Sequence, residues 1–226
     1  MSTSSANSAT VISLSTLTAL LLFSLVSLCG CSSAYYSAME KVGVHKRDIL
    51  IDRVEKARDS QAEAQKQFKS ALDQFNSVVQ LKDTDLKDAY ERLAAEYQDC
   101  EKAAARVTER IDKVEDVSEA LFAEWEHELD LYENQNLRRA SKEQLRTTRT
   151  RYEKMLRSMR TAEASMTPVL KTFRDNVLFL KHNLNAQAIG SLQAEFSSLE
   201  KDIDALIRKM NEAIGQSNAF IEQMGN

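Results

Sequence analysis

LKDAYERLAAEYQDCEKAAARVTERIDKVEDVSEALFAEW, residues 86–125, decides the fold of this 226-residue chain. Its apolar residues recur in steps of four and three, the spacing of one helix face packed along a continuous seam. The series is Leu86, Tyr90, Leu93, Tyr97, Cys100, Ala104, Val107, Ile111, Val114, Leu121 and Trp125. The stretch contains neither Pro nor Gly, so it predicts one long helix.

The same apolar spacing occurs in three other stretches, residues 50–78, 145–180 and 189–220. No stretch alternates in the two-residue period of a strand, so the chain is expected to be all-α. Short connections between long helices make consecutive helices antiparallel neighbours. We therefore expect an elongated antiparallel bundle of about four long, coiled-coil-like helices, with approximate ranges 45–81, 84–134, 137–183 and 186–224.

The breaks between these series carry helix-capping residues. Residues 82–85 offer Asp and Thr as N-caps, and Asn-rich turns stand at 134–136 and 183–185. Pro168 removes a backbone donor, yet the apolar register continues on both sides of it. We expect the helix to continue through Pro168 with a kink.

The first 30 residues have the composition of a lipoprotein signal peptide. They contain no Lys, Arg, Asp or Glu, and the largely apolar run 11–28 ends in Leu28-Cys29-Gly30-Cys31. A hydrophobic residue followed by two small residues and a cysteine is the pattern cleaved by lipoprotein signal peptidase. We expect cleavage after Gly30 and lipidation of Cys31, followed by a lipid-proximal segment, residues 31–44, with a short helix.

An alternative for the leader is an uncleaved membrane anchor, because it lacks the basic start of most signal peptides. The apolar run is at the lower limit of length for spanning a bilayer, and Ser and Thr dilute it. Ser32, rather than Asp, follows Cys31, which favours sorting to the outer membrane. We expect a protein anchored by lipid to the periplasmic face of that membrane.

The strongest charge feature is a pair of opposite blocks on either side of Asn134. The stretch 115–133 contains many Asp and Glu and no Lys or Arg, whereas 138–160 is mainly basic. The candidate basic patch comprises Arg138, Arg139, Lys142, Arg146, Arg149 and Arg151. An antiparallel hairpin would place the two blocks side by side, and their mutual neutralisation is one interpretation. Binding of an anionic membrane or another polyanion is the other.

No motif for catalysis, a phosphate loop or a metal is present in the sequence. The three histidines, His45, His127 and His182, are far apart in the chain, and Cys100 occupies an apolar helix position. We therefore expect no enzyme activity, no cofactor and no metal. No nucleic-acid partner is expected in the periplasm, and the oligomeric state stays open.

Three further stretches carry a resemblance to a known family: SAYYSAMEKVGVHKRDIL at 33–50, LFAEWEHEL at 121–129 and LKHNLNA at 180–186. The chain resembles a family of uncharacterised bacterial putative lipoproteins, a domain of unknown function, whose members open with a lipid-acceptor Cys and SAYYxxMEKxGxHKRDIL. The resemblance covers the whole mature chain. It implies a helical periplasmic lipoprotein and no established activity.

We expect a non-enzymatic, lipid-anchored envelope protein with a scaffolding or protein-binding role, whose partners are the membrane through Cys31 and an unknown envelope protein. The second hypothesis is a module that binds anionic membranes or polyanions through the basic face of the third helix.

Overall fold

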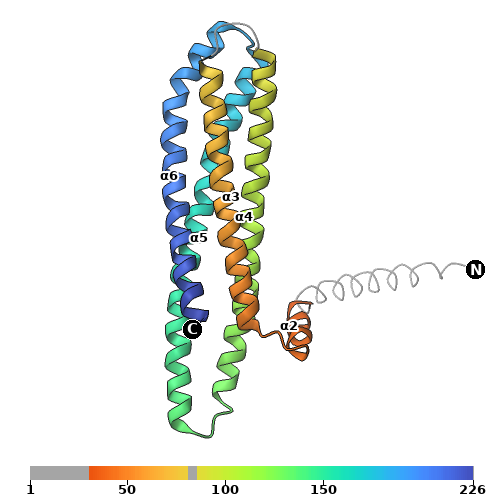
Figure 1. Cartoon of the computed structure of the whole chain (residues 1–226), viewed down its shortest axis with the longest axis vertical. Coiled ribbons are helices and arrows are strands. Elements are labelled where there is room, and N and C mark those ends of the chain that lie inside the picture. Colours follow the sequence, from red (N-terminus) through yellow and green to blue (C-terminus); the bar gives the residue numbers. More distant parts are fainter. Residues whose placement is uncertain (1–30, 81–85, 226) are drawn as a thin grey trace, which may run out of the picture. The chain divides into compact units, whose positions relative to one another are not determined.

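The computed structural model describes residues 31–80 and 86–225, and every regular element in these ranges is an α-helix (Figure 1). The chain divides into two compact units, Met1–Lys46 and Arg47–Asn226. The second unit is built from four long helices: α3 (Lys46–Val79), α4 (Leu86–Leu129), α5 (Gln135–His182) and α6 (Ala186–Gly225). The predicted all-α bundle of long helices is confirmed.

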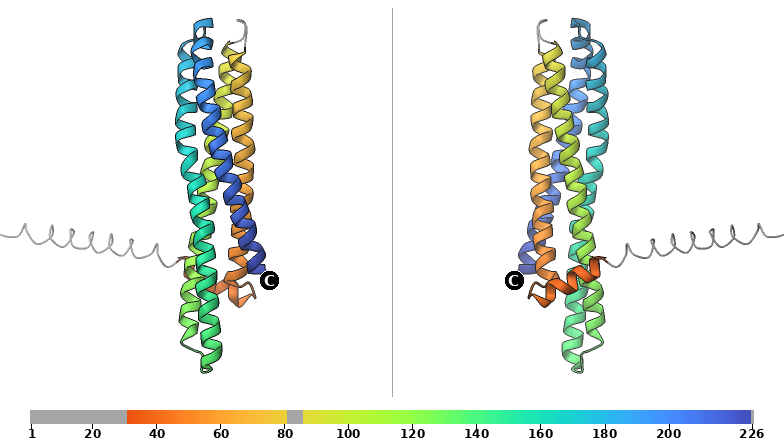
Figure 2. Two further views of the ribbon diagram at one scale, coloured as in Figure 1. Left: turned by 90° about the vertical axis from the view of Figure 1, so that its left-hand side faces the viewer. Right: turned by 90° about the vertical axis from the view of Figure 1, so that its right-hand side faces the viewer.

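The four long helices form an antiparallel ring in which each lies beside the next along the chain (Figures 1 and 2). The first and last helices close this ring. Arg58 of α3 donates to the side chain of Asn218 of α6 at 3.1 Å, and Gln65 donates to Asn211 at 2.9 Å. The end at which α4 turns into α5 is called the tip end below, and the opposite end is called the far end.

Aromatic side chains hold the bundle together near both ends. Towards the far end, each helix contributes one ring: Phe75 lies 6.3 Å from Phe173 and 5.9 Å from Phe196, and Tyr97 lies 5.9 Å from Phe173, between ring centroids. Towards the tip end, Tyr152 of α5 contacts one ring of α4 and one of α6. These rings are Phe122 at 5.3 Å and Phe220 at 6.2 Å. Each edge-on pair adds stability beyond the area it buries.

Between the aromatic clusters, small side chains allow the helices to approach closely. The buried alanines of this middle section are Ala57, Ala64, Ala103, Ala104, Ala162 and Ala213. Two fully buried polar residues lie among them, Gln61 of α3 and Ser217 of α6. The Ser217 hydroxyl donates to the Ala213 carbonyl at 2.7 Å, whereas neither polar side-chain atom of Gln61 has a partner within the described residues.

The α4–α5 hairpin extends beyond the other two helices at the tip end, as Figure 1 shows. Arg47, near the start of α3, donates to the carbonyl of Met224 at the end of α6. The start of α3 and the end of α6 therefore lie at the same level along the bundle. We call residues 123–146, the part of the hairpin beyond that level, the stem. Leu129 and Leu145 are the only residues buried within it.

The turn at the tip end differs from the expected range. The second helix ends at Leu129 rather than at residue 134, and the third begins at Gln135. The Asn134 side chain accepts hydrogen bonds from the backbone N–H of Asn136 at 2.9 Å and of Leu137 at 3.2 Å. An N-cap residue needs an extended backbone, and Asn134 has φ −78° and ψ 109°, so the preceding helix has to end earlier.

Helix α5 continues through Pro168 to His182, which confirms that this proline is not a boundary. Val169 and Phe173, which continue the apolar register after Pro168, are buried. The connection to α6 is short: the side chain of Asn185 accepts a hydrogen bond from the Ala188 backbone at 3.0 Å. The remaining ends lie at Lys46 and Val79 for α3 and at Ala186 and Gly225 for α6. The predicted capping residues 83–85 lie outside the described residues.

In the N-terminal unit, α2 spans Cys31–Lys41 and ends in a glycine cap. The Gly43 N–H donates to the Glu40 carbonyl at 2.9 Å, and the Val44 N–H donates to the Met39 carbonyl at 3.0 Å. Gly43 has φ 85°, a left-handed conformation that residues with a Cβ rarely adopt. Across the described part of the chain, no helix has the length and apolar composition needed to cross a membrane.

Gln61→Leu is expected to raise the free energy of unfolding by about 1–2 kcal/mol, because a buried polar group without a partner costs that much. Urea denaturation followed by circular dichroism measures this change. The matched control is Gln187→Leu on the exposed surface of α6, which should change stability by no more than about 0.5 kcal/mol. A loss of stability in Gln61→Leu would show that the amide is satisfied in solution.

Candidate interaction surface on the α4–α5 hairpin

The acidic block of α4 and the basic block of α5 lie side by side and form ion pairs along the hairpin. Arg138 contacts Asp130 at 2.6 Å next to the turn, and Arg149 contacts Glu126 at 2.7 Å. Arg160 contacts Asp112 at 2.6 Å further from the tip. The pairing expected between the two blocks is therefore present at several levels. These ion pairs favour one register of the hairpin, because sliding α5 along α4 would separate the charged partners.

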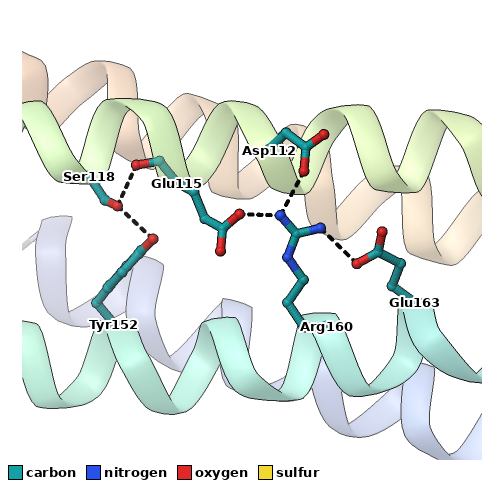
Figure 3. Close-up of polar contacts among 6 residues, drawn as sticks. All are labelled: Asp112, Glu115, Ser118, Tyr152, Arg160 and Glu163. Carbon is teal, nitrogen blue, oxygen red and sulfur yellow. Dashed lines mark hydrogen bonds and ion pairs between the residues drawn. The ribbon is translucent and has the colours of Figure 1, made fainter.

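Arg160 is the centre of the largest of these charge clusters (Figure 3). Its guanidinium contacts Asp112 and Glu115 of α4 and, at 2.8 Å, Glu163 of its own helix. Burial alone would lower the pKa of Arg160, but the hydrogen bonds that it donates to Glu115, Glu163 and Asp112 raise its pKa above the ordinary value. Because the Arg160 side chain is only 32% exposed, solvent screens this cluster less than it screens surface pairs.

A neutral polar contact lies one turn nearer the tip (Figure 3). The hydroxyls of Ser118 and Tyr152 are 2.5 Å apart, and Ser118 also donates to the backbone carbonyl of Glu115 at 2.8 Å. Burial raises the pKa of Tyr152 to about 12, so its hydroxyl remains protonated at physiological pH. This contact connects α4 and α5 directly beneath the aromatic cluster formed by Tyr152.

In the stem, one aromatic residue is fixed by a side-chain hydrogen bond. The indole Nε1–H of Trp125 donates to the Ser141 hydroxyl at 2.9 Å, across the hairpin. On the other side of the hairpin, the Arg149 guanidinium lies 5.0 Å from the centre of the Phe122 ring. A cation over an aromatic face is attracted to it. The hydrogen bond of Trp125 therefore joins the two helices within the stem, whereas the cation–π contact joins them just below it, at residues 122 and 149.

The candidate basic patch does not form one continuous face. At 3.6 residues per turn, Arg138, Lys142 and Arg149 share one side of α5, whereas Arg151 faces the other way. Arg149 borders a hollow with Phe122, while Arg151 lines a separate cavity with Trp125. The patch therefore divides into a face formed by residues 138–149 and the isolated Arg151.

Within the patch, the residues differ in how far they are neutralised. Arg138 and Arg149 pair with α4, Arg146 pairs with Glu143 at 2.6 Å, and Arg139 donates to the side chain of Asn136 at 2.9 Å. Lys142 is exposed and forms no ion pair with any described residue. The charge available to an external anion is thus concentrated at Lys142 and its exposed neighbours Arg139 and Arg146.

A cavity of about 560 Å³ opens where α3 and α6 end and the stem begins. Its apolar lining includes Leu121, Trp125 and Met224. Its charged lining consists of Arg47, Glu124, Glu128, Glu143 and Arg151. No group of three or more His, Cys, Asp or Glu residues suited to a metal ion occurs in the described ranges. The cavity offers a mixed polar and apolar surface suited to side chains of a binding partner.

Exposed apolar residues gather at both ends of the bundle. At the tip end these are Leu131, 69% exposed, Tyr132, 38% exposed, and Leu137, 57% exposed. At the far end they are Leu178, Phe179 and Leu184. The exposure of the leucines was not predicted from the sequence. In the sequence, these leucines differ from core leucines because each one falls outside the four-and-three apolar series.

Of the predicted lipidation residues, Cys31 and Ser32 form the start of α2, and Leu28, Cys29 and Gly30 lie outside the described residues. Cys100 is a free, buried cysteine. Burial, assisted by the nearby carboxylates of Glu96 and Asp99, raises the pKa of its thiol to about 12. Cys100 is therefore a packing residue rather than a reactive thiol.

A family model described as "Protein of unknown function (DUF2959)" matches residues 35–224, from within α2 to the residue before the end of α6. No curated protein and no solved structure matches the chain.

Arg160→Met is expected to lower the free energy of unfolding by about 1–3 kcal/mol, because it removes several charge-assisted hydrogen bonds and leaves carboxylates facing one another. Arg157→Met on the same helix is the matched control. Among the described residues its one ion pair, with Glu153, is long at 3.7 Å and exposed, so the effect of removing it should be small. Equal stability losses in the two variants, measured in urea, would contradict a special role for the Arg160 cluster.

Proposed function

Because the chain belongs to this family of unknown function, we propose from its own residues that it is a non-enzymatic lipoprotein of the bacterial envelope. It is anchored by lipid on Cys31 to the periplasmic face of the outer membrane. The observation that carries the proposal is the Leu28-Cys29-Gly30-Cys31 sequence at the end of an uncharged apolar leader, directly before the first described helix.

The bundle supports a scaffolding or protein-binding role. Its interior is a narrow seam filled by side chains, and its strongest charges are used within the α4–α5 hairpin. The surfaces left for a partner are the stem cavity around Trp125 and the exposed apolar residues at the two ends. Such surfaces suit an envelope protein as the partner, because partly apolar patches rimmed by charge are typical of protein interfaces.

A second proposal is that the basic face of α5 binds an anionic membrane or another polyanion. The observation in its favour is the exposed Lys142, which forms no ion pair among the described residues and lies near Arg139 and Arg146. Binding of this kind depends on counterion release, so it should weaken steeply as salt increases. It does not exclude the first proposal, because a lipid-anchored protein can use both surfaces.

Metabolic labelling with palmitate tests the first proposal. Cys31→Ser should abolish labelling and release the protein from the outer-membrane fraction, because the thiol that receives the lipid is missing. Cys100→Ser is the matched control and should leave labelling unchanged, since that thiol is buried within α4. Recovery of unlabelled full-length protein from the cytosol would contradict the proposal.

Flotation with anionic vesicles tests the second proposal. Arg139→Glu combined with Lys142→Glu should reduce binding at low salt, because each substitution reverses one exposed charge of the basic face. Arg151→Glu is the control, since this residue lies on the other side of α5. A form that begins at Ser32 is used for all variants, so that neither the lipid nor the apolar leader holds the protein on the vesicle. Equal binding by both variants would exclude the basic face as the site.

A further inference from the structure

The tip of the α4–α5 hairpin carries apolar side chains that nothing in the bundle covers. Leu131 and Tyr132 lie in the turn, and Leu137 lies in the first turn of α5. Their exposures of 69%, 38% and 57% are high for side chains of this size. An apolar cluster at the end of a projecting element is typical of a contact surface.

The ends of α3 and α6 show how far the tip projects beyond the rest of the bundle. Lys46, the first residue of α3, and Gly225, the last of α6, lie at the tip end of the bundle (Figure 1). Contacts of Arg53 with Lys113 and Asp116 place the start of α3 level with about residue 122 of α4. The hairpin therefore extends about 15 Å further to its turn, at about 1.5 Å per residue.

The chain that joins Cys31 to α3 is long enough for the tip to reach the surface that holds the lipid. With its eleven residues of α2 helical, residues 31–45 span up to about 30 Å. This exceeds the overhang of the hairpin. The far end lies beyond this reach, because the forty-eight residues of α5 extend about 70 Å.

We propose that Leu131, Tyr132 and Leu137 insert into the interface of the bilayer to which Cys31 is anchored, as a second, non-covalent membrane contact. This proposal rests on the proposed lipidation. The lipid keeps the bilayer at high local concentration, so a small apolar contact is sufficient. Tyrosine is favoured at the level of lipid head groups, and leucine is favoured in the adjoining acyl region.

The charges around the tip determine the type of membrane contact. Glu128, Asp130 and Glu133 lie on one side of the turn, and Arg138, Arg139 and Lys142 lie on the other. These equal numbers of acidic and basic residues give no net attraction to anionic lipid. The contact is therefore apolar and independent of lipid charge, which distinguishes it from binding through the basic face.

The test uses the lipidated full-length protein reconstituted in vesicles of neutral phosphatidylcholine. Tyr132→Cys carries an environment-sensitive fluorophore, and Phe179→Cys at the far end, 39% exposed in the parent chain, is the matched control. The buried Cys100 and the lipidated Cys31 do not take the label. We expect a blue shift and quenching by brominated lipid at position 132 and neither at position 179. Adding Leu131→Ser and Leu137→Ser to the labelled chain should remove most of the quenching.

Flotation of the same vesicles separates this proposal from the lipid anchor. If the labelled protein floats but position 132 is not quenched, the tip contact is wrong and the anchor stands. If the protein does not float, the lipidation on which the contact rests is wrong. Quenching at position 132 that appears only with anionic lipid, or equally at position 179, would also overturn the proposal.

Discussion

The structure depends on one continuous apolar seam shared by four helices. Each helix presents an apolar stripe too narrow to be stable alone, so no helix is stable until its neighbours cover it. The seam is widest where Phe75, Tyr97, Phe173 and Phe196 meet and where Tyr152 contacts its aromatic neighbours. Between them, alanines bring the backbones close together. Gln61 is unusual in this seam, because its buried amide has no hydrogen-bond partner among the described residues.

Apolar packing alone does not select one register along such a seam, because a slide of one heptad preserves the pattern. The charges supply this selection in the α4–α5 hairpin. Arg138, Arg149 and Arg160 each meet an acidic partner on α4 at 2.6–2.7 Å. The Arg138–Asp130 pair lies within the stem and the Arg149–Glu126 pair at its base, where little apolar area is buried. One set of charges therefore sets the register and supports the projecting tip.

The all-α class, the long helices, the antiparallel order and the continuation through Pro168 were predictable, because periodicity and capping residues act locally. The opposed charge blocks also indicated the hairpin pairing. The end of α4 was predicted too late, since Asn134 was taken as its last residue although it caps the next helix. The division of the basic patch was missed because adjacent charges in sequence point to different sides of α5. The exposed Leu131 and Leu137 were missed because exposure depends on where neighbouring helices end.

The closure of the ring by α3 and α6 has a consequence for the order of folding. Contacts between consecutive helices are local in sequence, whereas those of Arg58 with Asn218 and Gln65 with Asn211 join residues that are 160 and 146 positions apart. During synthesis or export from the N-terminus, α3, α4 and α5 emerge before the helix that covers their remaining apolar stripe. The partly formed three-helix intermediate exposes an open groove along its length, which only the last helix of the chain can fill. Loss of the whole of α6 would therefore expose the core along the bundle rather than shorten it.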